Sequence, residues 1–165
     1  MSNATKYRAF YDGEFYLSDD QGEEFMFELN PDGWSLSIMD HYFESGSGAA
    51  EEYYRYIEAK GAIFDQFTGR SDTEGNELFA HDIIAFTFWW FDGNECVTLL
   101  TGEIVYSEEH MSYQLKGVKN KEWQAHTGED GSDYLTPFSE LNFEDADFHR
   151  IGNSHQNPEL LEVVL

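Results

Sequence analysis

Short stretches of alternating apolar and polar residues, separated by turn-forming residues, recur along most of the chain. The stretch at 6–17 predicts a β-hairpin, because Asp12-Gly13 at its centre can supply the positive φ angles of a tight turn. Residues 23–29 and 34–39 predict a second pair of strands around a turn that contains proline and glycine. The N-terminal part is therefore expected to consist largely of hairpins.

From residue 62 onward the pattern is again mainly that of strands. Residues 82–91 are apolar on both alternating faces, which is typical of a strand in the centre of a sheet. Gly102 predicts a bulge or bend in the strand that contains it. Strands at such spacing are typical of a small barrel or sandwich. The predicted strands cover residues 62–69, 82–91, 96–106, 111–118 and 148–151.

Two segments carry helical signals. Residues 49–61 have acids near the start, Lys60 near the end, and Gly61 as a possible C-terminal cap. The apolar side chains of this segment are expected to share one helical face that packs on a sheet. A second, short helix is predicted after Asn157, the expected N-cap, with Pro158 in its first turn.

Length and composition place these elements in one domain. The chain has 165 residues, enough for a single core, and we divide it into hairpins plus helix at 1–61 and a barrel-like core at 62–165. We expect a mainly β fold with one or two short helices, and an α+β fold is the alternative. Aromatic residues make up 17% of the chain. We interpret them chiefly as core residues, with an exposed aromatic platform for a ligand as the alternative.

The formal net charge of −24 restricts the choice of partner. Such a charge disfavours direct binding to nucleic acid or to an anionic membrane, and it leaves a basic partner, a cation or solubility alone. Acids on a rigid surface could also imitate a phosphate backbone, so we keep a nucleic-acid mimic as a second hypothesis. The partner surface would consist of acids from two segments: Glu129, Asp130, Asp133, Glu144, Asp145 and Asp147.

The sequence offers little evidence of catalysis or of cofactors. The histidines lack the spacing of a helical zinc site, and the acidic run at 72–77 fails the EF-hand pattern and is interpreted as a turn. Cys96 is the only cysteine, so no intrachain disulfide can form. We see no signal peptide and no apolar run long enough to span a bilayer. We therefore expect a cytoplasmic protein without a cofactor, and a metal-dependent enzyme is the third hypothesis.

Three segments together resemble the YopX family of phage and prophage proteins. "FDQFTGRSDTEGNELFAHDIIAF" is similar to the hallmark of the family, and "TGEIVY" resembles the strand that follows it. "HRIGNSHQNPELLE" resembles the C-terminal signature of the family. The family's Glu-Gly step before Asp82 is replaced here by Ala80-His81. The positions that carry the resemblance are Thr68, Gly69, Gly75, Asp82, Gly102, Gly152, Asn153, Asn157 and Pro158.

The resemblance implies a mainly β fold with an SH3-like small barrel in the C-terminal part, and an origin in a phage, prophage or mobile element. It implies no catalytic residue, because the family has no established activity. At the matching positions we expect structural roles: glycines that permit turns, and an Asp82 carboxylate that accepts hydrogen bonds from local backbone. The function that we expect is a non-enzymatic module that binds an unknown protein partner, and a basic protein is one candidate.

Overall fold

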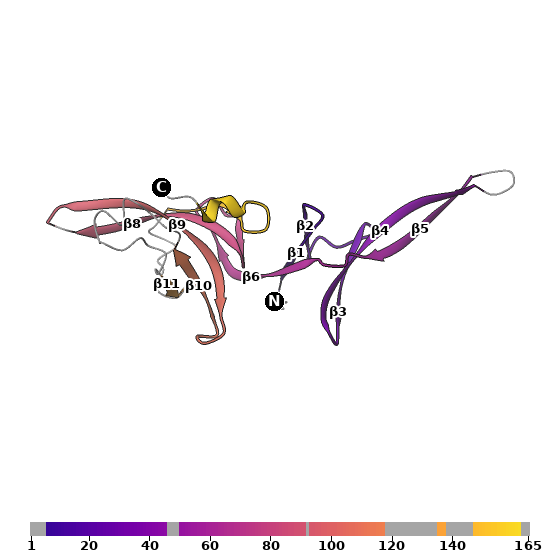
Figure 1. Ribbon diagram of the computed structural model, residues 1–165, viewed down its shortest axis with the longest axis horizontal. Helices are drawn as coiled ribbons and strands as arrows, with labels where there is room; N and C mark the ends of the chain where they lie inside the picture. Colours follow the sequence, from indigo (N-terminus) through magenta and orange to yellow (C-terminus); the bar gives the residue numbers. More distant parts are fainter. Residues whose placement is uncertain (1–5, 46–49, 92, 118–134, 138–146, 163–165) are drawn as a thin grey trace. The chain divides into compact units, whose positions relative to one another are not determined.

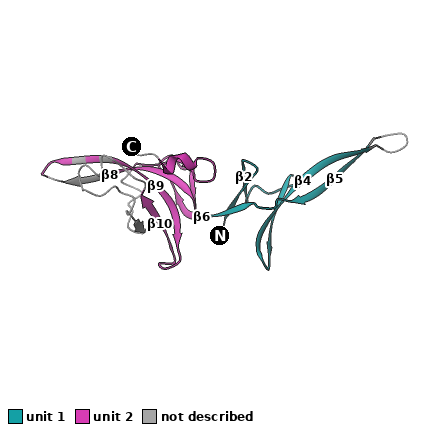
Figure 2. Ribbon diagram, viewed as in Figure 1, with its two compact units in different colours: residues 1–66 teal, residues 67–165 magenta. Residues whose placement is uncertain are grey.

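The computed structural model describes residues 6–45, 50–91, 93–117, 135–137 and 147–162 (Figure 1). These residues are mainly β strands, as predicted from the sequence. The chain forms two compact units, residues 1–66 and residues 67–165, and strand β6 (Ile63–Ser71) runs from the first into the second (Figure 2). The prediction of a single domain divided after residue 61 stays a prediction.

The first unit is built from hairpins, and its predicted turns are confirmed. Strands β1 (Tyr7–Tyr11) and β2 (Glu14–Leu17) form the first antiparallel hairpin. Asp12 and Gly13 turn the chain with φ angles of 50° and 84°, as the Asp-Gly pair predicted. The first residues of β6 pair with the other edge of β1.

A three-stranded sheet completes this unit, in the order β3-β4-β5. Its strands are β3 (Phe25–Asn30), β4 (Gly33–Ser45) and β5 (Ala50–Glu58). Apolar side chains from both sheets meet in one core, which stabilises the unit by removing them from water. The buried members of that core are Ala9, Phe27, Leu36 and Ala59, and the half-buried ones around them include Tyr7, Tyr16, Trp34 and Phe64.

The predicted helix at 49–61 is wrong, because residues 50–58 form strand β5. Arg55, which as a helix would pair with Glu51, instead lies opposite Asp40 of β4 and forms an ion pair with it. Aromatic residues favour strands, and a neighbouring strand with a matching alternation outweighs weak helical end signals. Gly61 does adopt a positive φ of 86°, but it does so in the turn between two strands.

The second unit contains a five-stranded antiparallel sheet in the order β11-β10-β9-β8-β12, curled into a half-barrel (Figure 1). The central position predicted for residues 82–91 is confirmed, since β8 lies between β9 and β12. The SH3-like detail stays a prediction. The strands are β8 (Asp82–Phe91), β9 (Glu95–Ser107), β10 (Ser112–Gly117), β11 (Leu135–Pro137) and β12 (Phe148–Asn153), and β7 (Glu77–Phe79) pairs with the end of β6.

The half-barrel surrounds a core of its own. This core explains Gly102, for which a bulge or a bend was predicted. The residue lies in a regular part of the ladder between β8 and β9, so the bulge is wrong. A Cβ atom at this position would lie 2.6 Å from Leu115, which is fully buried. Glycine is therefore needed for close packing. The buried members of the core are Leu78, Ile84, Phe86, Leu100, Ile104, Leu115 and Phe148.

The last described element is a short 3₁₀ helix, η2 (Pro158–Leu161), with proline in its first turn as predicted. Asn157 is its N-cap residue, as predicted, although its side chain makes no capping hydrogen bond. Its Oδ1 instead accepts a hydrogen bond from the N–H of Asn153 at 3.4 Å. None of the helices in the described segments is both long enough and apolar enough to cross a membrane.

Candidate functional site

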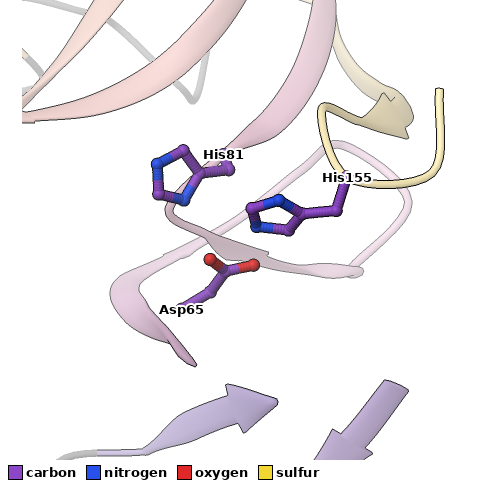
Figure 3. A group of neighbouring side chains, drawn as sticks. All are labelled: Asp65, His81 and His155. Carbon is purple, nitrogen blue, oxygen red and sulfur yellow. The ribbon is translucent and has the colours of Figure 1, made fainter. Parts of the chain in front are cut away.

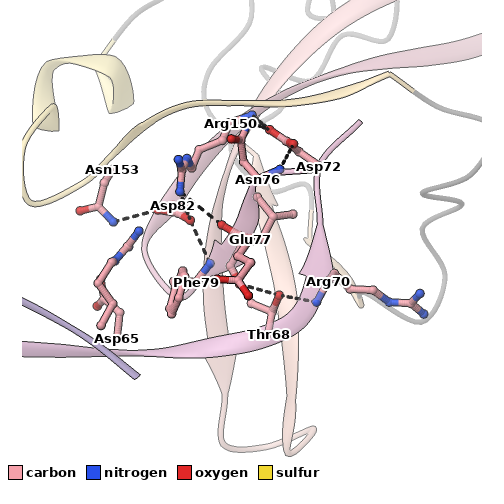
Figure 4. Close-up of polar contacts among 12 residues, drawn as sticks. Asp65, Thr68, Arg70, Asp72, Asn76, Glu77, Phe79, Asp82, Arg150 and Asn153 are labelled. Carbon is pink, nitrogen blue, oxygen red and sulfur yellow. Dashed lines mark hydrogen bonds and ion pairs between the residues drawn. The ribbon is translucent and has the colours of Figure 1, made fainter. Parts of the chain in front are cut away.

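The second unit contains a polar frame, which we define as Asp72, Asp82, Arg150 and Asn153 (Figure 4). Two of these residues, Asp82 and Asn153, were predicted as family-motif positions. Asp72 lies in the turn between β6 and β7, and only 7% of it is exposed. Its carboxylate accepts hydrogen bonds from the backbone N–H groups of Glu74 at 3.0 Å, Asn76 at 2.8 Å and Arg150 at 3.1 Å. The side-chain amide of Asn76 donates a fourth, at 3.0 Å. The turn predicted at 72–77 is confirmed, and the carboxylate stabilises its backbone.

Two opposing effects set the protonation of Asp72. Burial by itself would raise the pKa of this carboxyl, because a charge loses hydration in the protein interior. The hydrogen bonds from Asn76, from the backbone of Arg150 and from the backbone of Glu74 stabilise the ionised form. Their combined effect holds the pKa of Asp72 below its ordinary value. The carboxylate is therefore a charged anchor for this turn.

Asp82 likewise holds backbone in place, at the start of β8, and it is fully buried. It accepts hydrogen bonds from the N–H of Phe79 at 2.9 Å and from Nδ2 of Asn153 at 3.1 Å. Nη1 of Arg150 lies 4.0 Å from the carboxylate of Asp82 and donates to the carbonyl of Glu77 at 3.2 Å. The predicted contact between Asp82 and local backbone is confirmed, and it joins β7, β8 and β12.

The remaining motif residues also have structural contacts. Thr68 donates its hydroxyl hydrogen to the carbonyl of Leu78 at 2.8 Å. Gly69 and Gly75 adopt φ angles of 82° and 87°, which side chains with a Cβ atom disfavour. The turn role predicted for Gly75 is confirmed. Gly69 instead lies within strand β6, where the pairing with β7 shifts register, so the turn predicted for it is wrong. At Gly152 a Cβ atom would lie 2.6 Å from Leu160, and glycine therefore lets η2 lie against β12.

His81, which stands where the family pattern has glycine, has a φ of 64°. Such an angle costs a residue with a side chain about 1 kcal/mol or more. In the second unit its ring lies 5.0 Å from that of His155, measured between centroids (Figure 3). Asp65, also drawn in Figure 3, belongs to the first unit, where it accepts a hydrogen bond from Arg8 at 2.9 Å. Within the described part of the second unit, no three potential metal ligands lie close together. A structural zinc site needs four.

The first unit presents a different surface, the aromatic hairpin, which we define as residues 38–45 of β4 and 50–57 of β5. Strand β3 pairs with β4 only up to Ile38. Beyond this point β4 and β5 continue as a ribbon of two strands, which Figure 1 shows extending away from β3. Two-stranded ribbons are only marginally stable alone. Cross-strand contacts between side chains add to its backbone pairing, each by a fraction of a kcal/mol up to about 1 kcal/mol.

One face of the aromatic hairpin carries a row of stacked rings. The rings of His41 and Tyr54 stack with centroids 4.7 Å apart, and Phe43 follows at 4.8 Å from His41. Nε2 of His41 lies 2.6 Å from a carboxylate oxygen of Glu52, which also accepts a hydrogen bond from the hydroxyl of Tyr54 at 2.6 Å. The stack leaves Phe43 65% exposed and Tyr54 60% exposed.

The opposite face also carries stacked aromatic rings beside carboxylates. Tyr42 and Tyr53 stack with centroids 5.6 Å apart. The guanidinium of Arg55 lies 4.7 Å from the ring centre of Tyr42 and 3.0 Å from the carboxylate of Asp40. The hydroxyl of Tyr53 donates to Glu51 at 2.5 Å. Both faces of the ribbon thus carry aromatic side chains that other strands of the unit leave accessible.

Hydrogen bonds between phenols and carboxylates shift the pKa of Tyr53, Tyr54 and Glu52. Hydrogen bonds to Glu51 and Glu52 raise the pKa of Tyr53 and of Tyr54, because an ionised phenol would lose the donor. The same bond from Tyr54, aided by the charge of His41, lowers the pKa of Glu52. These tyrosines therefore stay neutral hydrogen-bond donors near neutral pH.

The aromatic hairpin was not predicted as a site from the sequence, because residues 49–61 were expected to form a helix. A signal was present: Tyr54 and Tyr56 alternate with Tyr53 and Arg55, as the two faces of a strand require. The exposed aromatic platform kept as an alternative describes this region better than a buried core. The predicted acidic surface is not tested, since Glu129, Asp130, Asp133, Glu144 and Asp145 lie outside the described residues. Asp147 is described, and it is exposed.

Comparisons with known proteins relate the chain to one protein family. A protein-family model described as "YopX protein" matches residues 6–162, nearly the whole chain. No curated protein matches the sequence. Among solved structures, the chain is similar to the crystal structure of protein EF1440 from Enterococcus faecalis, with 20% identity and a TM-score of 0.48. That alignment covers 95% of this chain and 97% of the other.

Proposed function

The chain belongs to the YopX family, and on that premise we propose that it is a non-enzymatic accessory protein of a phage, prophage or other mobile element. It acts in the cytoplasm of a bacterial host by binding a protein partner. The observation that carries the proposal is the aromatic hairpin. Exposed aromatic side chains are enriched in the energetically dominant centres of protein interfaces.

The composition of the aromatic hairpin supports a protein as its partner. Phe43, Tyr54 and Tyr56 offer apolar area, and the stacking of Tyr54 on His41 holds one ring in place before any partner arrives. A ring that is already ordered loses little conformational freedom on binding. Exposed groups of apolar side chains commonly mark sites of association.

The second unit supports the non-enzymatic part of the proposal. The carboxylates of Asp72 and Asp82 are both buried and accept hydrogen bonds from backbone and amide groups that they hold in place. A general acid or base must instead reach a substrate proton, and a buried carboxylate committed to a turn does not. We therefore assign the polar frame to stability and the aromatic hairpin to binding.

Photo-crosslinking tests this function directly. A photoreactive phenylalanine analogue is placed at position 43 or, as a matched control on β3 in the same unit, at position 29, where Leu29 is 69% exposed. In host lysate we expect one protein to crosslink from position 43 and not from position 29. The double variant Phe43→Ser/Tyr54→Ser should retain that protein at least about tenfold less well, since two central aromatic residues each contribute more than about 1 kcal/mol.

Two outcomes would contradict the proposal. Equal crosslinking from both positions would mean non-specific adhesion of apolar surface, and a partner held equally by the double variant would bind elsewhere. A parallel capture at low and high salt addresses the nucleic-acid mimic, which predicts a complex that weakens steeply with salt and is competed by DNA. Aromatic contacts predict a complex that largely survives salt.

A further inference from the structure

A cleft of about 290 Å³ opens at the base of the aromatic hairpin, within the first unit. We call it the hairpin cleft. Ile38 and Ile57, which lie directly opposite each other on β4 and β5, form one wall. Tyr11 and Tyr16, from the β1–β2 hairpin, contribute aromatic surface to the lining. The cleft is thus bounded by two hairpins and lined largely by apolar and aromatic groups.

The charged residues that line the hairpin cleft are all acidic: Asp12, Asp40 and Glu58. Asp40 already has an ion-pair partner in Arg55. Asp12 and Glu58 are exposed, and neither has an ion pair among the residues that the structure describes. The pKa of Tyr16 is raised, first by burial and then by the charges of Glu14 and Asp12, which agrees with a negative potential at this place.

The unit itself shows how such a surface holds a cation. Arg55 places its guanidinium over the ring of Tyr42 while it pairs with Asp40. Arg8 does the same over Phe15, at 4.3 Å from the ring centre, while it pairs with Asp65. In both cases a guanidinium has an aromatic face on one side and a carboxylate as its hydrogen-bond acceptor. The hairpin cleft offers the same two components without an arginine of its own.

We propose that the hairpin cleft accepts an arginine side chain of the protein partner, an inference that rests on the proposed function. The methylene groups of the arginine would lie along Ile38 and Ile57, and the guanidinium would pair with Asp12 and Glu58. Arginine fits better than lysine, because its planar guanidinium stacks on aromatic rings and is more weakly hydrated. The net charge of −24 favours a basic partner in the same way.

A titration with small probes tests the cleft. Nα-acetyl-arginine amide is added to the ¹⁵N-labelled protein, and amide shifts are followed by NMR. We expect saturable shifts at Tyr11, Asp12, Ile57 and Glu58 with a dissociation constant on the order of 1 mM, because a single side chain buries little area. The neutral isostere Nα-acetyl-citrulline amide and the lysine analogue should each bind at least about threefold more weakly.

A charge-matched pair of variants separates the cleft from general acidity. Asp12→Asn/Glu58→Gln should weaken arginine binding by about fivefold, because two partly exposed ion pairs are lost. Asparagine tolerates the positive φ at position 12, so the turn should be retained. The control Glu28→Gln/Asp32→Asn removes two exposed charges from the same unit but outside the cleft, and it should leave binding unchanged. Equal weakening by both pairs, or equal binding of citrulline, would overturn the proposal.

The amount of crosslinked partner that each variant retains distinguishes a failure of this inference from a failure of the proposed function. If Phe43→Ser/Tyr54→Ser loses the partner and Asp12→Asn/Glu58→Gln retains it fully, the hairpin cleft holds no arginine and the proposed function stands. If both double variants retain the partner, the proposed function fails as well. A partner that Asp12→Asn/Glu58→Gln holds several-fold less well, while Glu28→Gln/Asp32→Asn holds it normally, would support the arginine site.

Discussion

In the turn that contains Asp72, four donors converge on one buried carboxylate, whereas along the aromatic hairpin each polar contact joins exposed neighbours. Tyr53 and Tyr54 each donate to a glutamate two residues away, and their rings remain accessible. Both regions are rich in hydrogen bonds, yet only buried groups lose much when a partner is removed, because water can replace an exposed partner. The number of polar contacts is therefore a poor guide to stability here.

The comparison also separates the two kinds of aromatic residue in the chain. Phe86 and Phe148 stack with centroids 5.6 Å apart inside the second core, and each is 2% exposed. Tyr42 and Tyr53 stack at the same distance on the aromatic hairpin, where Tyr53 is 37% exposed. The geometry is similar, but the second pair keeps its apolar area available to a partner. The first arrangement contributes to stability, and the second is the one that we propose for recognition.

The largest effect is expected at Asp82. Asp82→Ala leaves the N–H of Phe79 and the amide of Asn153 without their buried acceptor, and we expect a loss of about 3 kcal/mol in the free energy of unfolding of the second unit. Urea denaturation followed by circular dichroism measures it. A loss below about 1 kcal/mol would mean that the polar frame contributes no more than surface contacts do.

A smaller loss is expected from overpacking the half-barrel. Gly102→Ala brings a Cβ atom to 2.6 Å from Leu115, which should lower the free energy of unfolding by about 2 kcal/mol. The control is Gly22→Ala, at an exposed position with open space around its Cβ and an ordinary φ, where we expect no loss. Thermal unfolding compares the two. Equal melting temperatures would show that Leu115 moves aside freely.

The charge on Asp72 predicts a dependence on pH. The pKa of Asp72 is lower in the folded state than in the unfolded chain, so its contribution is fully present above its ordinary value, about 4, and is lost as the pH falls through the folded value. Asp72→Asn should therefore cost about 1.5 kcal/mol at pH 6 and progressively less toward pH 3. Denaturation of wild type and variant at pH 6, 4 and 3 measures this. A difference that is constant with pH would contradict the assignment.

The smallest effect on stability is expected at the aromatic hairpin. Phe43→Ser and Tyr54→Ser should each change the free energy of unfolding by no more than about 0.5 kcal/mol, because both side chains are exposed in the folded protein. The same denaturation experiment measures this. A loss of 2 kcal/mol or more would erase the contrast with Asp82 and would mean that the exposed rings stabilise the first unit.

Much of the fold follows from local signals in the sequence. The Asp12-Gly13 turn, the strand at 82–91 with two apolar faces and the turn at 72–77 are all present where the pattern predicts them. These features depend on the conformational freedom of glycine and on the period of a strand, which act over a few residues. The family motif likewise marked Asp82 and Asn153 of the polar frame, but not Asp72 or Arg150.

Pairing between separate strands determined the features of the fold that local signals did not predict. Residues 50–58 carry acids and a base at helical spacing, but β4 provides a partner strand whose aromatic residues match theirs face by face, and no local signal reports that partner. Asp72 and Arg150 are far apart in the sequence and meet only because β12 pairs with β8 at the edge of the sheet. The sequence by itself determined a mainly β, strongly acidic chain with its turns in place. Only the tertiary structure decided which rings are buried and which remain exposed, because burial depends on contacts between segments that lie far apart along the chain.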